Sequence, residues 1–195
     1  SGQLATSTNA KGETTAYTYD TSNRLTLVTG PVAGATTAYT YDGFNRIATT
    51  TTDGMTITTA YDVFDRPTTV WNPDGTTEQT TYDRLDVATR TDRLGRVTRY
   101  VHDALRRLVS TQDPAGRTIE QVWCACGSLD GLVDANRQRT TWERDVLGRV
   151  TREVRADGTT DTLYTYDLAG RMKTVTDPKD QVTTYTYALD DAVLS

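Results

Sequence analysis

The sequence predicts an all-β fold made of tandem β-hairpins, each about twenty-one residues long. Three observations lead to this prediction. A Tyr-Asp dipeptide recurs in phase, turn residues recur about every ten residues, and the segments between the turns are rich in Thr and Tyr. No helical period extends beyond one turn. We therefore expect roughly sixteen to eighteen short strands, each joined to the next by a turn.

The Tyr-Asp dipeptide sets the period. Its second residue, or the residue in that place, recurs at spacings of 20 to 22 residues. The intact copies are Tyr19-Asp20, Tyr41-Asp42, Tyr61-Asp62, Tyr82-Asp83 and Tyr166-Asp167, and the degenerate copies are His102-Asp103, Trp123-Cys124, Arg144-Asp145 and Tyr187-Ala188. Because the phase persists throughout, residues 1–195 are expected to form one array of about eight to nine repeats, with no separate second domain.

The residues after the Asp position predict a turn. The third residue is usually a type that tolerates a positive φ. It is found at Asn23, Asn45, Asp65, Asp86, Arg106, Gly127, Gly148, Gly170 and Asp191. The fourth is often arginine, at Arg24, Arg46, Arg66, Arg107, Arg149 and Arg171. We expect the Asp to accept backbone N–H groups, and the Arg to reach its own Asp or that of a neighbouring repeat. Most such pairs should face solvent and contribute about 0–1 kcal/mol each.

A second kind of turn lies eight residues before the Asp position. Its glycines are Gly12, Gly34, Gly54, Gly75, Gly95 and Gly116, with Gly158 displaced by one residue. Tetrapeptides such as NPDG and DPAG suit a type I turn followed by a left-handed residue. Gly75 and Gly116 are therefore expected to need a positive φ, and valine at either position should destabilise the chain.

The composition predicts a thin sheet rather than a thick core. Hydrophobic residues make up 36% of the chain, and eleven Tyr stand against two Phe, so burial depends on rings that carry a hydroxyl. In Tyr-x-Tyr-Asp both rings should share one face and form columns worth about 0.2–1 kcal/mol per pair. A flat meander of about seventeen strands would be roughly 80 Å wide, so a curved antiparallel ribbon is expected. Its open edges should pair with the rest of a longer array or with other copies.

Charge and hydropathy exclude several classes of partner. The formal net charge is −5, whereas a nucleic-acid binder usually presents a basic face. No run of eighteen apolar residues is present, which argues against membrane insertion. The first residues, SGQLATSTNAKG, contain no apolar signal core, so no targeting signal is predicted in this chain.

The segment WCACGSLDG at 123–131 departs most from the repeat. Cys124 and Cys126 could supply two metal ligands, but a zinc site normally needs four. A local disulfide between them would be strained, so we expect two small thiols packed near a turn. A disulfide between copies is a further alternative. The redox state of the pair is left open.

No catalytic, cofactor or metal site is predicted. His102, the only histidine, replaces a repeat Tyr, and no nucleophile motif accompanies it. The Asp residues match neither Gly-Asp nonapeptides nor the twelve-residue calcium loop, and are better explained as turn starters. Exposed aromatic residues could stack on sugars, so surface adhesion or glycan binding is the alternative function.

The segments YTYDTSNRL (17–25), YTYDGFNRI (39–47) and YTYDLAGRM (164–172) resemble the YD repeat of Rhs proteins, and the resemblance covers essentially the whole chain. The family includes bacterial polymorphic toxins, cocoon components of insecticidal toxin complexes, wall-associated proteins and teneurins. The resemblance implies a β-ribbon that spirals into a hollow shell, which in toxin members encloses a C-terminal cargo. It also implies a structural rather than enzymatic role, in a parent protein that is secreted or on the bacterial cell surface. DPAGR (113–117) and DPKDQ (177–181) resemble the family's cleavage motif only superficially, and we interpret both as turns.

Overall fold

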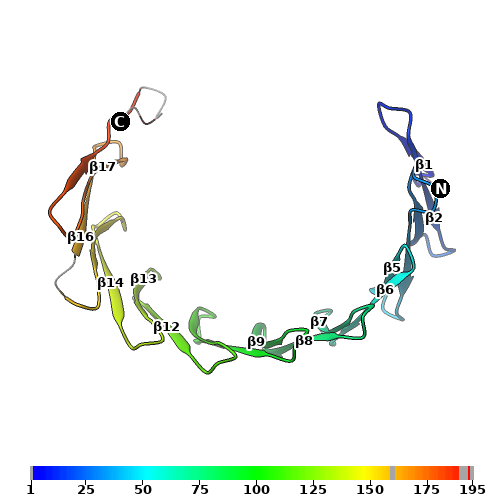
Figure 1. Cartoon of the computed structure of the whole chain (residues 1–195), viewed down its shortest axis with the longest axis horizontal. Helices are drawn as coiled ribbons and strands as arrows, with labels where there is room; N and C mark the ends of the chain where they lie inside the picture. The colour runs from blue at the N-terminus through cyan, green and yellow to red at the C-terminus, as the bar shows by residue number, and fades with distance from the viewer. Residues whose placement is uncertain (1, 159–160, 189–192, 194–195) are drawn as a thin grey trace. The chain divides into compact units, whose positions relative to one another are not determined.

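The computed structural model describes residues 2–158, 161–188 and 193, and every regular element among them is a β-strand. The chain divides into two compact units, residues 1–98 and 99–195. Both units consist of the same hairpin repeat, in which each strand pairs antiparallel with the next one along the chain (Figure 1). The tandem-hairpin fold that the sequence predicts is therefore confirmed.

The first unit is a meander of nine strands. They are β1 (Thr6–Thr8), β2 (Thr14–Tyr19), β3 (Leu25–Thr29), β4 (Thr36–Tyr41), β5 (Ile47–Thr52), β6 (Met55–Tyr61), β7 (Pro67–Trp71), β8 (Thr77–Asp83) and β9 (Asp86–Thr91). Alternation is clearest in β2, where Thr15, Tyr17 and Tyr19 are half-buried and the residues between them are exposed.

The second unit repeats this plan. Its strands are β10 (Val97–His102), which begins in the last residues of the first unit, β11 (Leu108–Gln112), β12 (Thr118–Trp123), β13 (Leu129–Val133), β14 (Arg139–Arg144), β15 (Val150–Val154), β16 (Asp161–Tyr166), β17 (Met172–Thr176) and β18 (Val182–Thr184). Turns alternate between the two ends of the strands in each unit, so the Tyr-Asp turns lie along one edge and the Gly turns along the other.

A bulge interrupts the pairing of each strand that ends in a Tyr-Asp position with the strand that follows it, just before the repeat tyrosine. The register shifts between Thr18 and Tyr19 in β2, and between Thr40 and Tyr41 in β4. Thr40 pairs with Thr49 while Tyr41 pairs with Ile47, so one residue of β5 is left over. The same shift recurs in β6, β8, β10, β12, β14 and β16. The unpaired residue therefore lies on the strand after the Tyr-Asp turn, and β2 still alternates as far as Tyr19.

The turns use left-handed residues where the sequence predicts them, with one exception. Asn23, Asn45 and Asp65 have φ of 65°, 65° and 62°, and Gly75 and Gly116 have φ of 82° and 80°. Asp86 was expected to be left-handed, and this is wrong. Asp83 pairs directly with Asp86, and Arg84 takes the positive φ of 53° in a two-residue hairpin loop. Asp191 lies outside the described residues.

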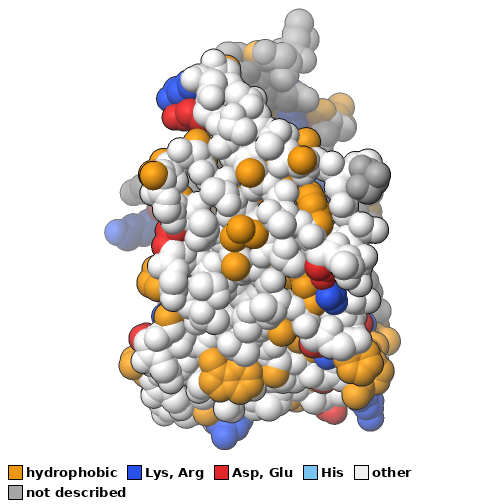
Figure 2. Space-filling model, turned by 90° about the vertical axis from the view of Figure 1, so that its right-hand side faces the viewer, with side chains coloured by type: hydrophobic (Ala, Val, Ile, Leu, Met, Phe, Trp, Pro, Cys, Tyr) orange, Lys and Arg blue, Asp and Glu red, His pale blue; other side chains and the backbone are white. Residues whose placement is uncertain are grey.

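Neither unit contains an ordinary hydrophobic core. Among the residues that the structure describes, no apolar side chain is fully buried, and Asn72 is the buried polar residue, with 6% exposed. On the face drawn in Figure 2, hydrophobic side chains lie in small groups between polar side chains and backbone. The stability of each sheet must therefore come largely from contacts along and between strands, which is where the repeat residues lie.

Candidate functional site

Four of the five intact Tyr-Asp turns are organised by their aspartate, and the exception is the Tyr82-Asp83 turn, where Asp83 pairs with Asp86. In the first turn, Asp20 Oδ1 accepts hydrogen bonds from the backbone N–H groups of Ser22 and Arg24, both at 2.9 Å. The backbone of the turn closes through Asn23 N–H to the Asp20 carbonyl, at 3.0 Å. The sequence predicts this arrangement, because the short Asp side chain can accept hydrogen bonds from the backbone N–H groups of its own turn. The second oxygen, Oδ2, remains to accept from the arginine side chain.

The repeat arginine binds the aspartate of its own turn. Arg24 Nε donates to Asp20 Oδ2 at 2.7 Å, and Arg66 Nη2 lies 2.6 Å from Asp62 Oδ2. The same pairing occurs in Asp42–Arg46, Asp103–Arg107, Asp145–Arg149 and Asp167–Arg171. One aspartate thus fixes both the backbone of the turn and the direction of the arginine.

The fixed guanidinium lies over the aromatic ring of the following repeat. Arg24 lies 4.6 Å from the centroid of Tyr41, and Arg66 lies 3.9 Å from that of Tyr82. The other such pairs are Arg46 over Tyr61, Arg107 over Trp123, Arg149 over Tyr166 and Arg171 over Tyr187. We call each set of Asp, Arg and next-repeat aromatic residue a cross-repeat clamp. The expected tyrosine column is therefore interleaved with guanidinium groups.

The same aromatic residue also binds back to the preceding repeat. Tyr41 Oη donates to the carbonyl of Leu25 at 2.7 Å, and Tyr82 Oη to that of Pro67 at 2.9 Å. Corresponding bonds join Tyr19 to Leu4, Tyr61 to Ile47, Tyr166 to Val150 and Tyr187 to Met172. Two degenerate copies preserve the bond with other donors, since Trp123 Nε1 reaches the Leu108 carbonyl and Arg144 Nη2 that of Leu129. The accepting carbonyl belongs to the residue after the arginine position.

Among the described residues, at least four clamps extend to the next turn through the arginine Nη1, including that of Arg107, whose Nη1 donates to the Cys124 carbonyl. Arg24 Nη1 donates to Asn45 Oδ1 at 2.9 Å, and Arg66 Nη1 to the Arg84 carbonyl at 2.6 Å. Arg46 reaches both the carbonyl of Asp62 and the carboxylate of Asp65. The arginine side chain therefore contacts its own turn, the next ring and the next turn together.

The clamp pairs are less exposed than the sequence suggested. Side chains of clamp arginines such as Arg46 and Arg66 are 17% and 22% exposed, because the next ring covers them. Solvent-facing pairs do occur in the Gly turns, where Arg96 and Arg117 bind Asp92 and Asp113 with 61% and 71% exposure. The expectation that most Asp-Arg pairs of the Tyr-Asp turns face solvent is therefore wrong, and the more exposed pairs lie in the Gly turns, where none was predicted.

These contacts lower the pKa of the turn aspartates. The Arg66 guanidinium hydrogen bond is the largest cause for Asp62, and the Arg24 backbone N–H is the largest cause for Asp20. Partial burial acts in the opposite direction and is outweighed. The pKa is likewise lowered for Asp42, Asp103, Asp145 and Asp167. All six carboxylates are thus charged at neutral pH, and each binds the backbone and the arginine of its own turn.

The Cys124 turn corrects one expectation. Cys124 and Cys126 form a disulfide, not two packed thiols. Strand β12 ends at Trp123, and the Gly127 N–H bonds the Cys124 carbonyl at 3.2 Å, so the pair lies in a turn. The two Cα atoms are 5.1 Å apart, within the range that a disulfide spans, so the expectation that a local disulfide would be strained was the source of the error.

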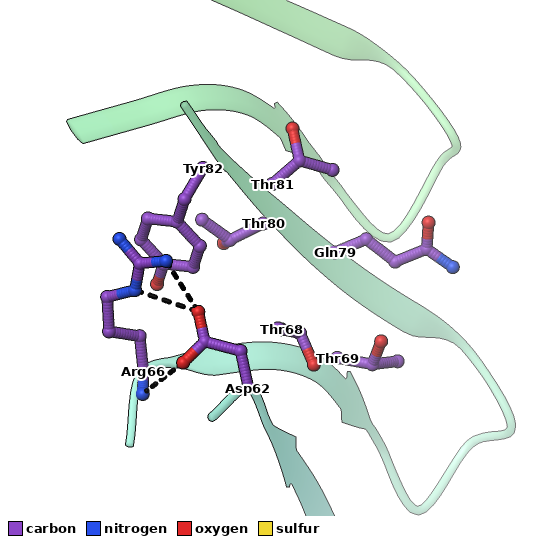
Figure 3. A pocket seen from close by; sticks show the side chains of 8 residues that line it. All are labelled: Asp62, Arg66, Thr68, Thr69, Gln79, Thr80, Thr81 and Tyr82. Atoms are coloured by element: carbon purple, nitrogen blue, oxygen red, sulfur yellow. Dashed lines mark hydrogen bonds and ion pairs between the residues drawn. The ribbon is translucent and has the colours of Figure 1, made fainter. Parts of the chain in front are cut away.

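The remaining candidate residues from the sequence are His102 and the acidic side chains considered as metal ligands. His102 ends β10 in the repeat-tyrosine position. In the part of the chain that the structure describes, no three or more His, Cys, Asp or Glu side chains form a metal-binding group. One shallow pocket between β7 and β8 is lined by Asp62, Arg66, Thr68, Thr69, Gln79, Thr80, Thr81 and Tyr82, so a clamp forms its wall (Figure 3).

The profile of the RHS Repeat family matches residues 1–32, 19–59, 82–118 and 145–182 of this sequence. These segments together cover more than half of the chain. The chain belongs to the RHS repeat family. The matched segments contain most of the Asp-Arg turns described above.

Solved structures show the same fold over nearly all of this RHS repeat chain. It matches the crystal structure of TcdB2-TccC3 without its hypervariable C-terminal region over 96% of its length, with a TM-score of 0.58 and 15% identity. It matches the Photorhabdus luminescens Tc holotoxin pore over 97%, with a TM-score of 0.56 and 15% identity. The RHS repeat chain covers 13% of each of those chains, so it spans about an eighth of their length.

No curated protein matches this RHS repeat chain. Nor do its described residues include a helix with the length and apolar character needed to cross a membrane.

Proposed function

We propose that this chain is a wall segment of a hollow Rhs-type shell, built by a longer protein around a C-terminal cargo. The cross-repeat clamp carries the proposal. Six of the described repeats hold their arginine against their own aspartate and present it to the ring of the next repeat, as Asp62, Arg66 and Tyr82 do. Such an array extends by adding repeats and needs no central core, which suits a wall better than a globule.

The similarity to much longer chains supports this role. This chain covers 12% to 14% of the Tc toxin structures that it matches. The proposal places it within an array that continues in the same repeat, in a protein that is secreted or on the cell surface. Other parts of that array and the cargo would be its partners.

A structural role also accounts for the repeat side chains, because their polar groups bind other groups of the repeat. The clamp aspartates and arginines bind each other, and the repeat tyrosine hydroxyls bind backbone carbonyls. We therefore propose a non-enzymatic function. Hydrolytic activity of the purified chain that disappears with His102→Ala would overturn this part of the proposal.

The experiment for the shell is limited proteolysis of the full-length protein, with electron microscopy of the same sample. We expect a hollow particle and a C-terminal segment that resists protease until the wall is opened by denaturant. A full-length frame without further repeats, or a C-terminal segment digested as fast in the intact protein as in the denatured one, would contradict the proposal.

Glycan adhesion remains the alternative, and the clamp geometry bears on it. A sugar needs an uncovered ring face, whereas Arg66 covers one face of Tyr82. The exposed rings are Phe44, Phe64 and Trp71, although Arg46 and Arg66 also lie 5.0 Å and 5.3 Å from the centroids of Phe44 and Phe64. Binding to a glycan array that is lost in Trp71→Ala or Phe64→Ala would favour adhesion, and no binding would favour the shell.

A further inference from the structure

The Cys124 turn lacks both charged residues of the clamp yet keeps the shape of the turn. Cys124 stands in the Asp position and Ser128 in the Arg position. The backbone nevertheless closes as in the other turns, with Cys124 N–H bonded to the Ser128 carbonyl at 2.9 Å. Cys124 Sγ accepts the Ser128 N–H at 3.2 Å, where Asp20 Oδ1 accepts the Arg24 N–H at 2.9 Å. The Cys124–Cys126 disulfide therefore takes the place of the ionic closure.

The turn that the disulfide closes receives the clamp of the preceding repeat. Arg107 Nη1 donates to the Cys124 carbonyl at 3.0 Å, and its guanidinium lies 5.7 Å from the centroid of the Trp123 ring. Asp103 binds the same guanidinium at 2.7 Å. A change in the backbone around Cys124 is thus transmitted to a contact between two repeats.

The two sulfur atoms differ in access and in surroundings. Cys126 is exposed, whereas Cys124 is half-buried. A thiolate approaching from solvent therefore meets Cys126 first, and Cys124 is the leaving sulfur. The Ser128 N–H and the nearby Arg107 charge, partly offset by Asp103, stabilise the departing thiolate.

We propose that the Cys124–Cys126 disulfide is a thiol–disulfide exchange site that takes a dithiol reductant as its substrate. One thiolate of the reductant attacks Cys126 Sγ, the Cys124–Cys126 bond breaks, and Cys124 leaves as a thiolate that takes a proton from water. The second thiol of the reductant then displaces Cys126 and closes its own disulfide. Two electrons pass from reductant to protein, which ends with two thiols.

Reduction loosens this turn and leaves the sheet folded. A disulfide across three residues removes little entropy from the unfolded chain, so it contributes little to global stability. Locally, however, residues 124–128 contain no aspartate or arginine of their own that could close the turn once the bond opens. The exchange site is thus a point at which a reductant weakens one repeat-to-repeat contact.

The first experiment treats the folded chain with dithiothreitol or with reduced glutathione, followed by alkylation and mass spectrometry of the peptide that contains both cysteines. We expect dithiothreitol to give two alkylated cysteines, and glutathione to give a mixed disulfide on Cys126. Reduction only after denaturation, or a mixed disulfide on Cys124, would overturn the assignment.

The second experiment follows amide hydrogen exchange with and without dithiothreitol. Loss of the turn's closure should speed exchange at Ser128 by about threefold to tenfold. The matched control is the double variant Cys124→Asp, Ser128→Arg, which restores the Asp-Arg pair and should exchange at one rate with or without reductant. Unchanged exchange at Ser128 on reduction of the natural sequence would overturn the proposed loosening.

Discussion

The guanidinium of Arg66 lies 3.9 Å from the centre of the Tyr82 ring, which belongs to the next repeat. Asp62 holds the guanidinium in this place at 2.6 Å, and Tyr82 in turn donates its hydroxyl to the Pro67 carbonyl. The contact thus links two hairpins through a charge, a ring and a backbone bond. In a sheet whose described apolar side chains are not fully buried, links of this kind replace a core.

Replacing Arg66 by lysine should destabilise the chain by about 1–2 kcal/mol, because lysine keeps the charge but loses the planar fork and the ring contact. The measurement is urea unfolding followed by tryptophan fluorescence. Arg96→Lys is the matched control, since Arg96 pairs with Asp92 at 61% exposure and should change stability by less than about 0.5 kcal/mol. Equal losses in both variants would show that the ring contact contributes nothing.

Removing the hydroxyl of Tyr41 tests the bond back to the preceding repeat. Tyr41→Phe leaves the Leu25 carbonyl without the donor that lies 2.7 Å away, and should cost about 0.5–1.5 kcal/mol. Tyr39→Phe, two residues earlier on β4, is the control and should cost less. Amide exchange across β3 and β4 gives the local free energy for each variant. A larger effect at Tyr39 would contradict the assigned role of the Tyr41 hydroxyl.

The hairpin fold could be predicted because its signals are local. Asp20 closes its turn with N–H groups two and four residues away, so the spacing of residue types records the contact directly. The glycines at positive φ are equally local. Asp86 could not be placed from the pattern, since the choice between two loop lengths depended on the pairing of Asp83 with Asp86.

The contacts between repeats were harder to predict. Sequence spacing placed the tyrosines in columns but could not show that a guanidinium lies between successive rings, as Arg24 does above Tyr41. The bulge opposite Tyr41 was also not predicted, because the sequence pattern does not show that one residue of β5 is left unpaired. The sequence did contain a signal for this bond. An apolar residue such as Leu25 usually follows the arginine position, and its carbonyl accepts the hydrogen bond from the Tyr41 hydroxyl. The Cys124 disulfide was missed because a bond between cysteines two residues apart was expected to be strained, whereas the turn brings their Cα atoms to 5.1 Å.

Acid should weaken the clamps. The pKa of Asp62 and of Asp145 is lowered from the ordinary 3.8, mainly by the hydrogen bonds from Arg66 and Arg149. A lowered pKa in the folded chain means that the contribution is fully present above 3.8 and is lost as the pH falls through the folded value. Unfolding free energy should therefore be flat from neutral pH to about 5 and fall below about 4.

The variant Asp62→Asn isolates the contribution of this one clamp to the pH dependence of stability. It removes one titrating carboxylate, so its stability at neutral pH should drop, and the difference from the natural chain should narrow as the pH falls below about 4. Urea unfolding at a series of pH values measures both curves. A difference that stays constant down to pH of about 2 would show that the Asp62 charge does not stabilise the fold.

Valine at Gly116 or Gly75 should destabilise the chain by about 1–2 kcal/mol through the backbone. Their φ values are 80° and 82°, and a Cβ at either position meets nothing within 4 Å, so the cost is conformational and not a clash. Gly43→Val is the matched control, because Gly43 also lies in open space at a turn but outside the left-handed region. Asparagine at Gly116 should cost less than valine, since it tolerates positive φ. Thermal unfolding of the four variants ranks their losses of stability. A loss for Gly43→Val equal to that for Gly116→Val would show that the valine side chain, and not the positive φ, causes the destabilisation.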